Sequence, residues 1–380
     1  MLYKLKDIFD LQMGKTPSRN NIEYWNTNDY KWVSIADLTK TDKYIYDTKE
    51  YLSKKAVNES GIKIIPANTV IMSFKLSIGK TAITAEDMYS NEAIMAFHDK
   101  HIVEILPEYI FYLFKYKNWD DGSNKAVMGK TLNKATLSEV EIDICSIEEQ
   151  RKIVNVLDKI MNLISARKKE LSYLDTFTKA RFVEMFESVQ ETCEVGYYVK
   201  SLIAGKSLAG ELECENKVLK TGAVSFDYFD VSQMKNLPVG YKPQKEHLVN
   251  AGDIIISRMN TAELTGAAAY VWSVPEKVYI PDRLWKVVLE EKCNPIFVWQ
   301  MLIQPSTKEQ IKRECSGTSG SMKNISKAGL LGIKVKKVHI DMQNQFADFV
   351  KQIDKSKSAV KKALDETQLL FDSLMQEYFG

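Results

Sequence analysis

The strongest constraint on the fold is an internal repeat, because the two halves of the chain present the same features in the same order. Residues 67–79 indicate a turn, a buried strand and a loop containing glycine, and residues 251–266 repeat this pattern. A helix entered through proline follows each copy, at Pro107 in the first half and at Pro295 in the second. The repeat predicts two similar globular domains rather than one continuous core.

Each copy ends in a long stretch without proline or glycine, over residues 147–186 and again over residues 342–379. Apolar residues recur there at helical spacing, which predicts two helices of roughly 50 Å each, longer than a domain core of this size requires. We therefore expect the two apolar faces to pack on each other, antiparallel and with approximate twofold symmetry, so that the pair acts as a spacer. The residues expected in this contact are Ile153, Leu157, Ile160, Ile164, Leu171, Leu174, Phe349, Ile353, Val360, Leu364, Leu370 and Leu374.

The domain organisation follows from the repeat and from the length. A chain of 380 residues with 45% hydrophobic residues is long and apolar enough for two domains of ordinary size. The expected fold class is α+β, with two globular α/β domains in tandem and a long helix after each. The expected boundaries are 1–146 for the first domain, 147–187 for the central helix, 188–340 for the second domain and 341–380 for the last helix.

Composition excludes several classes of protein. The formal net charge of +2 gives no global basic field, so any nucleic-acid binding must use local patches. The five cysteines form no closely spaced pair, which argues against a zinc ribbon and against a secreted disulfide framework. No window approaches twenty uninterrupted apolar residues, and the N-terminal residues lack the apolar run of a signal peptide. We expect a cytoplasmic protein without a membrane partner.

Motifs for nucleotide chemistry are incomplete. Gly-Lys-Ser/Thr triplets begin at Gly14, Gly79, Gly129 and Gly205, but none has the second glycine that a phosphate-binding loop places five residues earlier. A glycine-rich methyl-donor turn and the motif of an amino-methyltransferase are also missing. No serine-histidine-acid or cysteine-histidine arrangement stands out. The sequence therefore predicts a binding protein that holds no cofactor itself.

A metal-dependent nuclease is the enzymatic alternative. Asp282, Glu290 and Lys292 formally satisfy a PD…ExK cleavage pattern, but only eight residues separate the two acids and the first half has no matching acids. We interpret this match as chance on a surface strand. His98 and His101 could ligate a metal ion, yet nothing nearby completes a tetrahedral set, so no metal site is predicted. A coiled-coil scaffold protein is a further alternative, but it leaves the two globular halves without a role.

Both halves carry basic and amide side chains in glycine-flanked loops, interleaved with aromatic residues. Arginine and asparagine make bidentate contacts to guanine and adenine edges, and lysine suits phosphates. The candidate DNA-binding residues are Lys15, Arg19, Asn20, Tyr24, Lys75, Asn124, Lys125, Lys130, Lys206, Lys220, Arg258, Asn260, Arg283, Ser319, Lys323 and Asn324.

Several segments, in this order, carry a resemblance to a known family. They are Gly14-Lys15-Thr16-Pro17, Glu23-Tyr24-Trp25, residues 32–38, residues 252–258, and Ile147-Glu148-Glu149-Gln150, echoed by Met342-Gln343-Asn344-Gln345. The chain resembles, over its whole length, the DNA-specificity subunit of type I restriction-modification systems. It departs from the family pattern in the first half, where Asn68-Thr69 replaces the glycine-aspartate pair found at residues 252–253.

The resemblance implies a target-recognition domain in each half, and each domain would read one part of a split DNA sequence. It also implies that the helices set the gap between the two parts and hold two copies of an adenine methyltransferase subunit. Restriction and translocase subunits could join that assembly. Methyl transfer would then use S-adenosylmethionine bound by the partner, and this chain would be a non-catalytic specificity subunit.

Overall fold

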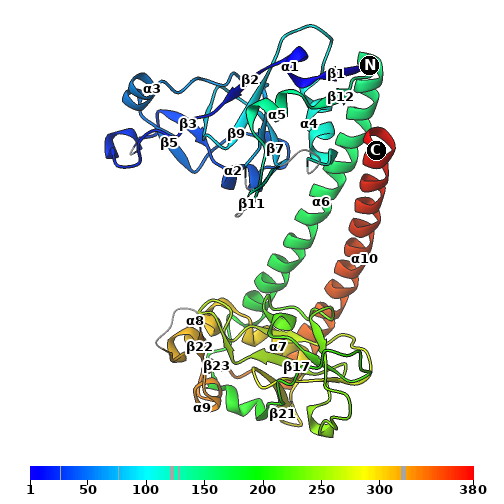
Figure 1. Cartoon of the computed structure of the whole chain (residues 1–380). Helices are drawn as coiled ribbons and strands as arrows, with labels where there is room; N and C mark the ends of the chain where they lie inside the picture. The colour runs from blue at the N-terminus through cyan, green and yellow to red at the C-terminus, as the bar shows by residue number, and fades with distance from the viewer. Residues whose placement is uncertain (26, 76, 120–123, 127–128, 318–321) are drawn as a thin grey trace. The chain divides into compact units, whose positions relative to one another are not determined.

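The computed structural model of the chain is a mixed α/β fold, and it describes residues 1–25, 27–75, 77–119, 124–126, 129–317 and 322–380 (Figure 1). For residues 124–126 and 129–131 it describes the backbone alone. The chain divides into two compact units. Unit 1 comprises Met1–Lys168 and Ala363–Gly380, and unit 2 comprises Lys169–Lys362. No helix among the described residues is long and apolar enough to cross a membrane.

The first half of the chain alternates short strands and helices before one long helix. The elements are β1 (Leu2–Lys4), α1 (Leu5–Ile8), β2 (Phe9–Met13), η1 (Ile22–Tyr24), β3 (Tyr30–Val33), α2 (Ile35–Lys40), β4 (Tyr44–Ile45), β5 (Glu50–Leu52), α3 (Lys54–Ser60), β6 (Val70–Ser73), β7 (Thr81–Thr84), β8 (Tyr89–Ser90), β9 (Ile94–Asp99), α4 (Pro107–Tyr116), β10 (Asn124–Ala126), β11 (Gly129–Thr131), α5 (Lys134–Ser138), β12 (Glu141–Asp143) and α6 (Ile147–Phe186).

The second half follows the same plan. Its elements are β13 (Thr192–Glu194), η2 (Val195–Tyr197), β14 (Val199–Ile203), β15 (Lys217–Leu219), η3 (Thr221–Val224), β16 (Met234–Asn236), η4 (Lys245–His247), β17 (Ile254–Ser257), β18 (Met259–Asn260), β19 (Ala268–Tyr270), β20 (Val278–Tyr279), β21 (Leu284–Leu289), α7 (Pro295–Leu302), α8 (Pro305–Glu314), β22 (Lys323–Asn324), α9 (Lys327–Leu331), β23 (Lys334–Lys336) and α10 (Ile340–Phe379).

The strand order shows that the two halves share one topology, except that β4 at the edge of the unit 1 sheet has no counterpart in the main sheet of unit 2. The main sheet of unit 1 has the order β2-β9-β6-β7-β4, and that of unit 2 has the order β14-β21-β17-β19. A three-stranded sheet accompanies each, β5-β3-β8 in unit 1 and β16-β15-β20 in unit 2. The central strands β6 and β17 are buried along their whole length, because their apolar runs have a strand on either side. The mixed α/β architecture and the duplication predicted from the sequence are confirmed.

Asn68-Thr69 replaces a glycine-aspartate pair in the first half, and the backbone of the turn before each central strand shows how this replacement is tolerated. Asn68 has a φ of +61° and Gly252 has a φ of +97°, so both occupy the left-handed region. The backbone N–H of Asn68 donates to Thr84 O at 2.7 Å, and that of Gly252 donates to Val271 O at 2.8 Å. Asparagine tolerates this conformation better than most residues with a Cβ. Asn68 therefore makes the same turn without a glycine.

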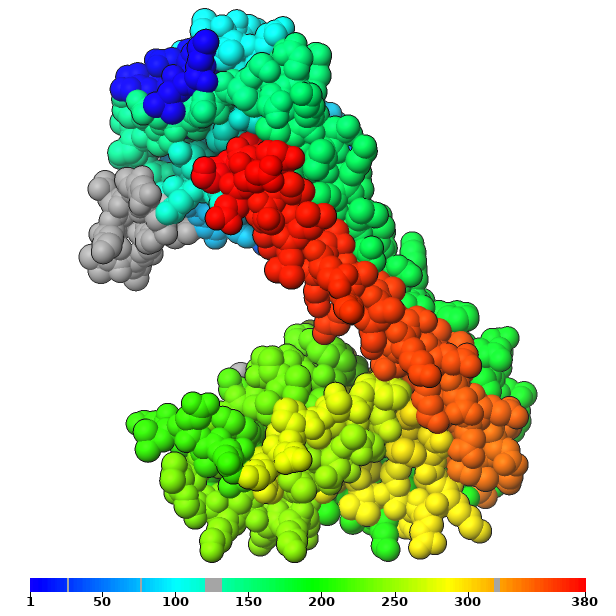
Figure 2. Space-filling view, turned by 90° about the vertical axis from the view of Figure 1, so that its right-hand side faces the viewer, coloured from blue at the N-terminus to red at the C-terminus, as the bar shows by residue number. Residues whose placement is uncertain are grey.

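The two long helices are equal in length, at 40 residues each. In unit 1 the first half of α6 runs antiparallel to the last turns of α10, which Figure 2 shows in green and red. Phe379 of α10 packs on Tyr109 of α4, with 5.5 Å between ring centroids. In unit 2 the second half of α6 packs with the first half of α10, and Phe186 lies 5.3 Å from Phe297 of α7. Each unit therefore completes its core with the end of the other half's helix.

One residue predicted in the contact between the two long helices, Leu370, is exposed. Ile153, Leu157, Ile160 and Ile164 are buried in the unit 1 core. Leu370 is 52% exposed, and the neighbouring Phe371 is buried instead, because one residue turns the helix by about 100°. The other predicted residues are half-buried: Leu171, Leu174, Phe349, Ile353, Val360, Leu364 and Leu374.

Candidate nucleic-acid interface

Four predicted contact residues of unit 2 meet on one pair of short strands. β18 pairs antiparallel with β22, which places Asn260 opposite Lys323 and puts Asn324 opposite the residue before Asn260. Arg258 precedes β18, and its backbone C=O accepts a hydrogen bond from Ile325 at 3.1 Å. Segments more than sixty residues apart in the sequence are thus joined, with Asn260 and Lys323 on one face of the strand pair and Asn324 on the other.

This region holds buried polar atoms without a partner. Among the described residues, Ser257 Oγ, Arg258 Nε, Trp285 Nε1 and Asn324 Oδ1 are buried and make no hydrogen bond. The Arg258 guanidinium carbon lies 5.5 Å from the centre of the Trp285 ring. Buried polar atoms in folded proteins are nearly always hydrogen-bonded. Ser257 and Trp285 lie in the core, whereas Arg258 and Asn324 are only half-buried as residues, so these two are the better candidates for contact with a ligand.

The basic side chains of unit 2 differ in their exposure and in their hydrogen bonds. Arg283 is exposed, and its backbone C=O accepts from the N–H of Arg258 at 3.1 Å. Lys206 and Lys220 are also exposed. Lys323 Nζ donates to the C=O of Gly317 at 2.6 Å, so this lysine also closes its own loop. The exposed members could neutralise phosphates, whereas the strand pair holds the more rigid donors and acceptors.

In unit 1 the predicted residues are occupied by contacts within the protein. Arg19 forms a two-point ion pair with Glu50, and its guanidinium carbon lies 3.8 Å from the centre of the Trp25 ring and 4.9 Å from that of Trp32. The hydroxyl of Tyr24 donates to Glu59 at 2.8 Å. These interactions stiffen the loop, and they reduce the capacity of Arg19 and Tyr24 to contact a base.

The remaining predicted residues of unit 1 are less constrained or are not described. Lys15 Nζ donates to the C=O of Ser60, Asn20 is exposed, and Lys75 Nζ lies 5.3 Å from the Phe74 ring. The side chains of Asn124, Lys125 and Lys130 lie outside the described residues, although their backbone forms the β10-β11 hairpin. Ser319 of the second half also lies outside the described residues.

The Gly-Lys-Ser/Thr triplets at Gly14 and Gly205 form close-packed turns. A Cβ on Gly14 would lie 2.1 Å from Asn91 O, and one on Gly205 would lie 1.8 Å from Ile280 O, so both positions require glycine. The hydroxyl that follows donates to a carboxylate in each case, Thr16 to Glu92 and Ser207 to Asp282. The triplets have a structural role, in agreement with the absence of a phosphate-binding loop.

This pairing gives Asp282 of the nuclease motif a structural role. Glu92 and Asp282 each accept from the hydroxyl of a Gly-Lys-Ser/Thr triplet, so the Asp282 carboxylate has a structural contact that recurs in the first half. Asp282 precedes β21 and Glu290 follows it. Eight residues of extended chain span about 26 Å at 3.3 Å per residue, so these two carboxylates cannot share a metal ion. The PD…ExK match is a coincidence of sequence.

The histidine pair forms no metal centre in the described part of the chain, where no cluster of three metal-ligating side chains occurs. His101 Nδ1 lies 3.2 Å from Asp99 Oδ2, on exposed backbone with a φ of +57°. Burial lowers the pKa of His98, and Asp10 opposes this effect. The imidazole of His98 is therefore disposed to remain neutral at neutral pH.

Asp253 lies in the turn that leads into β17, the strand that ends at Ser257. Asp253 Oδ2 accepts a hydrogen bond from the backbone N–H of Asn250 at 2.8 Å and lies 4.0 Å from Lys286 Nζ. Burial raises the pKa of the Asp253 carboxyl, against the lowering effects of that hydrogen bond and of Lys286. This turn fixes where β17 begins and hence where Ser257 and Arg258 lie.

Sequence reasoning missed two members of the cluster. Ser257 ends an apolar strand, and Trp285 lies within another, so both resemble ordinary core residues in the sequence. The available signal was the change from the run Ile254–Ile256 to Ser257-Arg258, which marks a buried strand that ends in polar groups.

Comparisons with known proteins agree with this architecture. Residues 1–173 match the family model described as the type I restriction modification DNA specificity domain. The chain is 33% identical over 188 residues to the type I restriction enzyme MjaIX specificity subunit of Methanocaldococcus jannaschii, covering 48% of this chain and 43% of that protein. It is 27% identical to the EcoR124I/EcoR124II specificity subunit of Escherichia coli, over 40% of this chain and 39% of the relative. These alignments span less than half of either relative.

Solved structures resemble the chain over its full length. The S subunit of a type I restriction-modification system from M. genitalium superposes with a TM-score of 0.56 at 14% identity, covering 100% of this chain and 96% of that one. A chain from a study of complex assembly and conformational transition of the type I R-M system gives a TM-score of 0.57 at 15% identity, covering 100% and 97%. At these identities the likeness shows the fold.

Proposed function

Because residues 1–173 carry the type I restriction modification DNA specificity domain, we propose that the chain is the DNA-specificity subunit of a type I restriction-modification complex. In this role, residues 1–146 and 188–340 are the two target-recognition domains, and each reads one part of a bipartite DNA sequence. Residues 147–187 and 341–380 are the spacer helices, which set the distance between the two parts.

The observation that carries this proposal is the duplication itself. The strands β2-β9-β6-β7 of unit 1 recur as β14-β21-β17-β19 in unit 2, and the three-stranded sheets also correspond, although the family model matches residues 1–173. A protein that recognises two separate DNA segments needs two similar reading units, and linking them raises the effective concentration of the second after the first has bound. Neither a nuclease nor a coiled-coil scaffold accounts for two such units.

The partners in this proposal are double-stranded DNA and two methyltransferase subunits, and restriction and translocase subunits could join them. S-adenosylmethionine belongs to the methyltransferase subunits, and this chain acts as a non-catalytic subunit in the cytoplasm. Its net charge of +2 is small for a DNA-binding protein of 380 residues. We therefore expect weak, salt-dependent DNA binding by the chain alone and tighter binding by the complex.

Within unit 2 we propose that the side chains of Arg258 and Asn324 contact base edges. The support is that Arg258 Nε and Asn324 Oδ1 have no hydrogen-bond partner, and that the Arg258 guanidinium lies over the Trp285 ring. The exposed Lys206, Lys220 and Arg283 would then contact phosphates.

The test is to map methylated adenines in the DNA of cells that express the neighbouring methyltransferase gene, with and without this chain. The expected result is methylation at a split motif, two short specific blocks separated by a fixed run of unspecified bases, only when the chain is present. Methylation that does not depend on the chain, or failure of the two proteins to form a complex, would overturn the proposal.

A further inference from the structure

The segment that follows η3 in unit 2 presents two aromatic rings to solvent. Phe226 is 70% exposed and Tyr228 is 53% exposed. Their ring centroids lie 6.4 Å apart and their planes meet at 19°, so the two rings are stacked. The next residue, Phe229, is half-buried and packs on the core that includes Val224. We call residues 226–228 the aromatic loop.

Asp227 holds the aromatic loop in place from between the two rings. Its φ of +64° lies in the left-handed region, which residues with a Cβ rarely occupy. Its Oδ1 accepts from the backbone N–H of Ala268 at 3.0 Å and from Lys308 Nζ of α8 at 2.5 Å. The loop is thus anchored to β19 and to α8, so little conformational freedom is left to lose when the rings bind a ligand.

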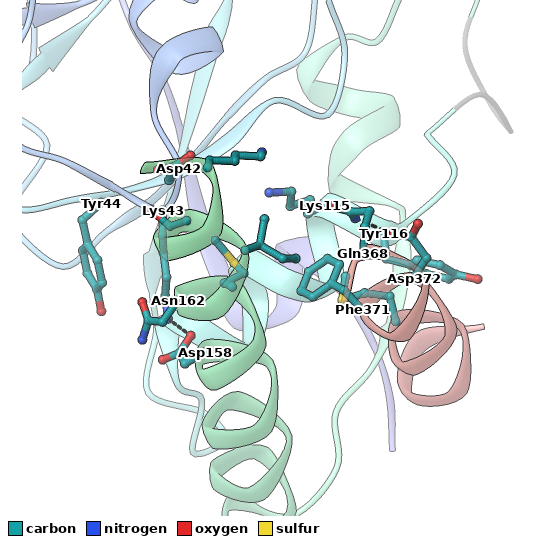
Figure 3. A pocket seen from close by; sticks show the side chains of 15 residues that line it. Asp42, Lys43, Tyr44, Lys115, Tyr116, Asp158, Asn162, Gln368, Phe371 and Asp372 are labelled. Carbon is teal, nitrogen blue, oxygen red and sulfur yellow. Dashed lines mark hydrogen bonds and ion pairs between the residues drawn. The ribbon is translucent and has the colours of Figure 1, made fainter. Parts of the chain in front are cut away.

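The equivalent segment of unit 1 is used within the protein. It follows α2 and forms β4, which pairs parallel with β7. The hydroxyl of Tyr44 in β4 donates to Glu108, and Figure 3 shows the neighbouring Lys43 paired with Asp158 of α6. β19 is the counterpart of β7 and has no such strand beside it. Unit 1 therefore exposes one ring here, Tyr46, where unit 2 exposes a stacked pair.

The aromatic loop lies at the end of the main sheet that carries the proposed DNA contacts. Ala268, to which Asp227 is bonded, begins β19 opposite Ile256, near the end of β17. Arg258 follows β17 and Arg283 precedes β21, and a backbone hydrogen bond of 3.1 Å joins these two arginines. This position favours DNA over a protein as the molecule that covers the two rings.

The carboxylates of this segment have partners of their own. Asp227 forms an ion pair with Lys308. Asp230 accepts from the N–H and the hydroxyl of Ser232 at 2.9 and 2.7 Å. These hydrogen bonds lower the pKa of Asp230 against the effect of burial, and Lys361 of α10 lowers it further. The exposed Lys220 lies directly before η3. Cations thus accompany both acids, which suits a segment that approaches phosphates.

We propose that the aromatic loop stacks on bases of the DNA read by unit 2, with Phe226 inserted at one base step and Tyr228 supporting it. Apolar side chains that enter a base step unstack it and kink the duplex. The inference rests on the proposed function, since the ligand is then the target DNA. It adds that unit 2 senses how readily one step deforms, besides reading base edges.

The first test uses the natural chain in complex with its methyltransferase subunits, without S-adenosylmethionine. The probe is a duplex that contains the methylated motif, with 2-aminopurine placed at one position of either block at a time. This base fluoresces more strongly when it is unstacked. The methylated adenines and their neighbours are left out, because methyltransferases flip their target base. We expect fluorescence to rise at one step of one block only, and no rise at any position would overturn the inference.

The second test compares variants in the same complex. Phe226→Ala should abolish the rise and weaken binding to the motif by about tenfold, because one stacking contact is lost. Phe226→Trp keeps an aromatic ring and should retain most of both. The salt dependence of binding should not change in Phe226→Ala, since no phosphate contact is removed. Tyr197→Ala is the matched control, because Tyr197 is 52% exposed and precedes β14 at the opposite end of the sheet.

The outcomes separate this inference from the proposed function. Unchanged DNA binding and fluorescence in a folded Phe226→Ala complex would overturn the inference alone. Failure of that variant to assemble with the methyltransferase subunit would also overturn it, because the rings would then belong to a protein interface. A natural complex with no preference for the split motif over random duplex would overturn the proposed function itself.

Discussion

Gln150 and Gln343 are equivalent residues that anchor the two long helices to the globular parts. Gln150 is fully buried; its side chain accepts from the N–H of Leu106 at 2.9 Å and donates to Glu104 O and Cys145 O at 2.9 and 3.0 Å. Gln343 accepts from the N–H of Asn294 at 3.0 Å and donates to Val338 O at 2.8 Å. One glutamine thus joins the start of each long helix to the segment before α4 or α7.

Replacing either glutamine by leucine should destabilise the chain strongly. Gln150→Leu leaves three partly buried backbone groups without their side-chain partner, and we expect the free energy of unfolding to fall by about 2–4 kcal/mol. Gln343→Leu should have a similar but smaller effect, because two such groups lose their partner. The measurement is urea denaturation followed by circular dichroism. The exposed Gln345 is the control, and Gln345→Leu should change stability by less than about 0.5 kcal/mol.

Asp253 provides a pH-dependent prediction at the same scale. Because burial raises the pKa of its carboxyl, the ionised form is less favourable in the folded than in the unfolded chain. The resulting destabilisation is present at neutral pH and disappears as the pH falls through the raised pKa. Asp253→Asn keeps an oxygen that can accept from Asn250, so we expect this variant to be more stable than the natural chain at pH 7. The difference in unfolding free energy should shrink towards pH 4, and a difference independent of pH would contradict the assignment.

At the scale of elements, aromatic side chains at the ends of the two long helices pack into the cores of the units. Phe186 is almost fully buried, with ring centroids 4.8 Å from Phe182, 5.3 Å from Phe297 and 5.5 Å from Phe346. Phe379 is half-buried and lies 5.5 Å from Tyr109. The same contact is thus made in both units, but it is more enclosed in unit 2.

We therefore expect Phe186→Ala to cost more than Phe379→Ala. The first change should lower the free energy of unfolding by about 3–5 kcal/mol, because it removes a buried ring and leaves a cavity. The second should cost roughly half as much, since its ring already contacts water. Guanidinium denaturation of both full-length variants would measure the difference. Equal losses would mean that the end of α10 is held as tightly as the end of α6.

The same elements show what could be predicted from the sequence. Both long helices were predicted within two residues of their observed starts, because neither contains proline or glycine and both are amphipathic. The inward position of Phe371 in place of Leu370 could not be predicted, since a shift of one residue still leaves an apolar stripe. The pairing of β18 with β22 could not be predicted from the sequence either, because each strand has two residues and the partners lie far apart in the chain. Candidate residues were chosen by type, so Arg19 was included although Glu50 and Trp25 hold it.

At the scale of the whole molecule, the two units have separate cores and separate sheets, so a change in one should leave the specificity of the other intact. Asn324→Ala removes the unpartnered amide oxygen from the unit 2 cluster and keeps the backbone hydrogen bonds to Ser316. We expect it to relax the preference at one base pair of a single block of the methylated motif. Losing one good base contact costs about 1–3 kcal/mol of discrimination, or roughly 5- to 150-fold.

A methylation map of the complex that contains the Asn324→Ala chain would measure this effect directly. The other block and the length of the unspecified gap should stay the same, because they depend on unit 1 and on the two helices. Arg313→Ala is the matched control, since Arg313 is an exposed residue of unit 2 outside the proposed contact cluster. Relaxation of both blocks together would show that Asn324 supports the fold rather than reading a base. An unchanged motif would show that the unpartnered amide contacts no base, and β18 and β22 would then have no part in sequence recognition.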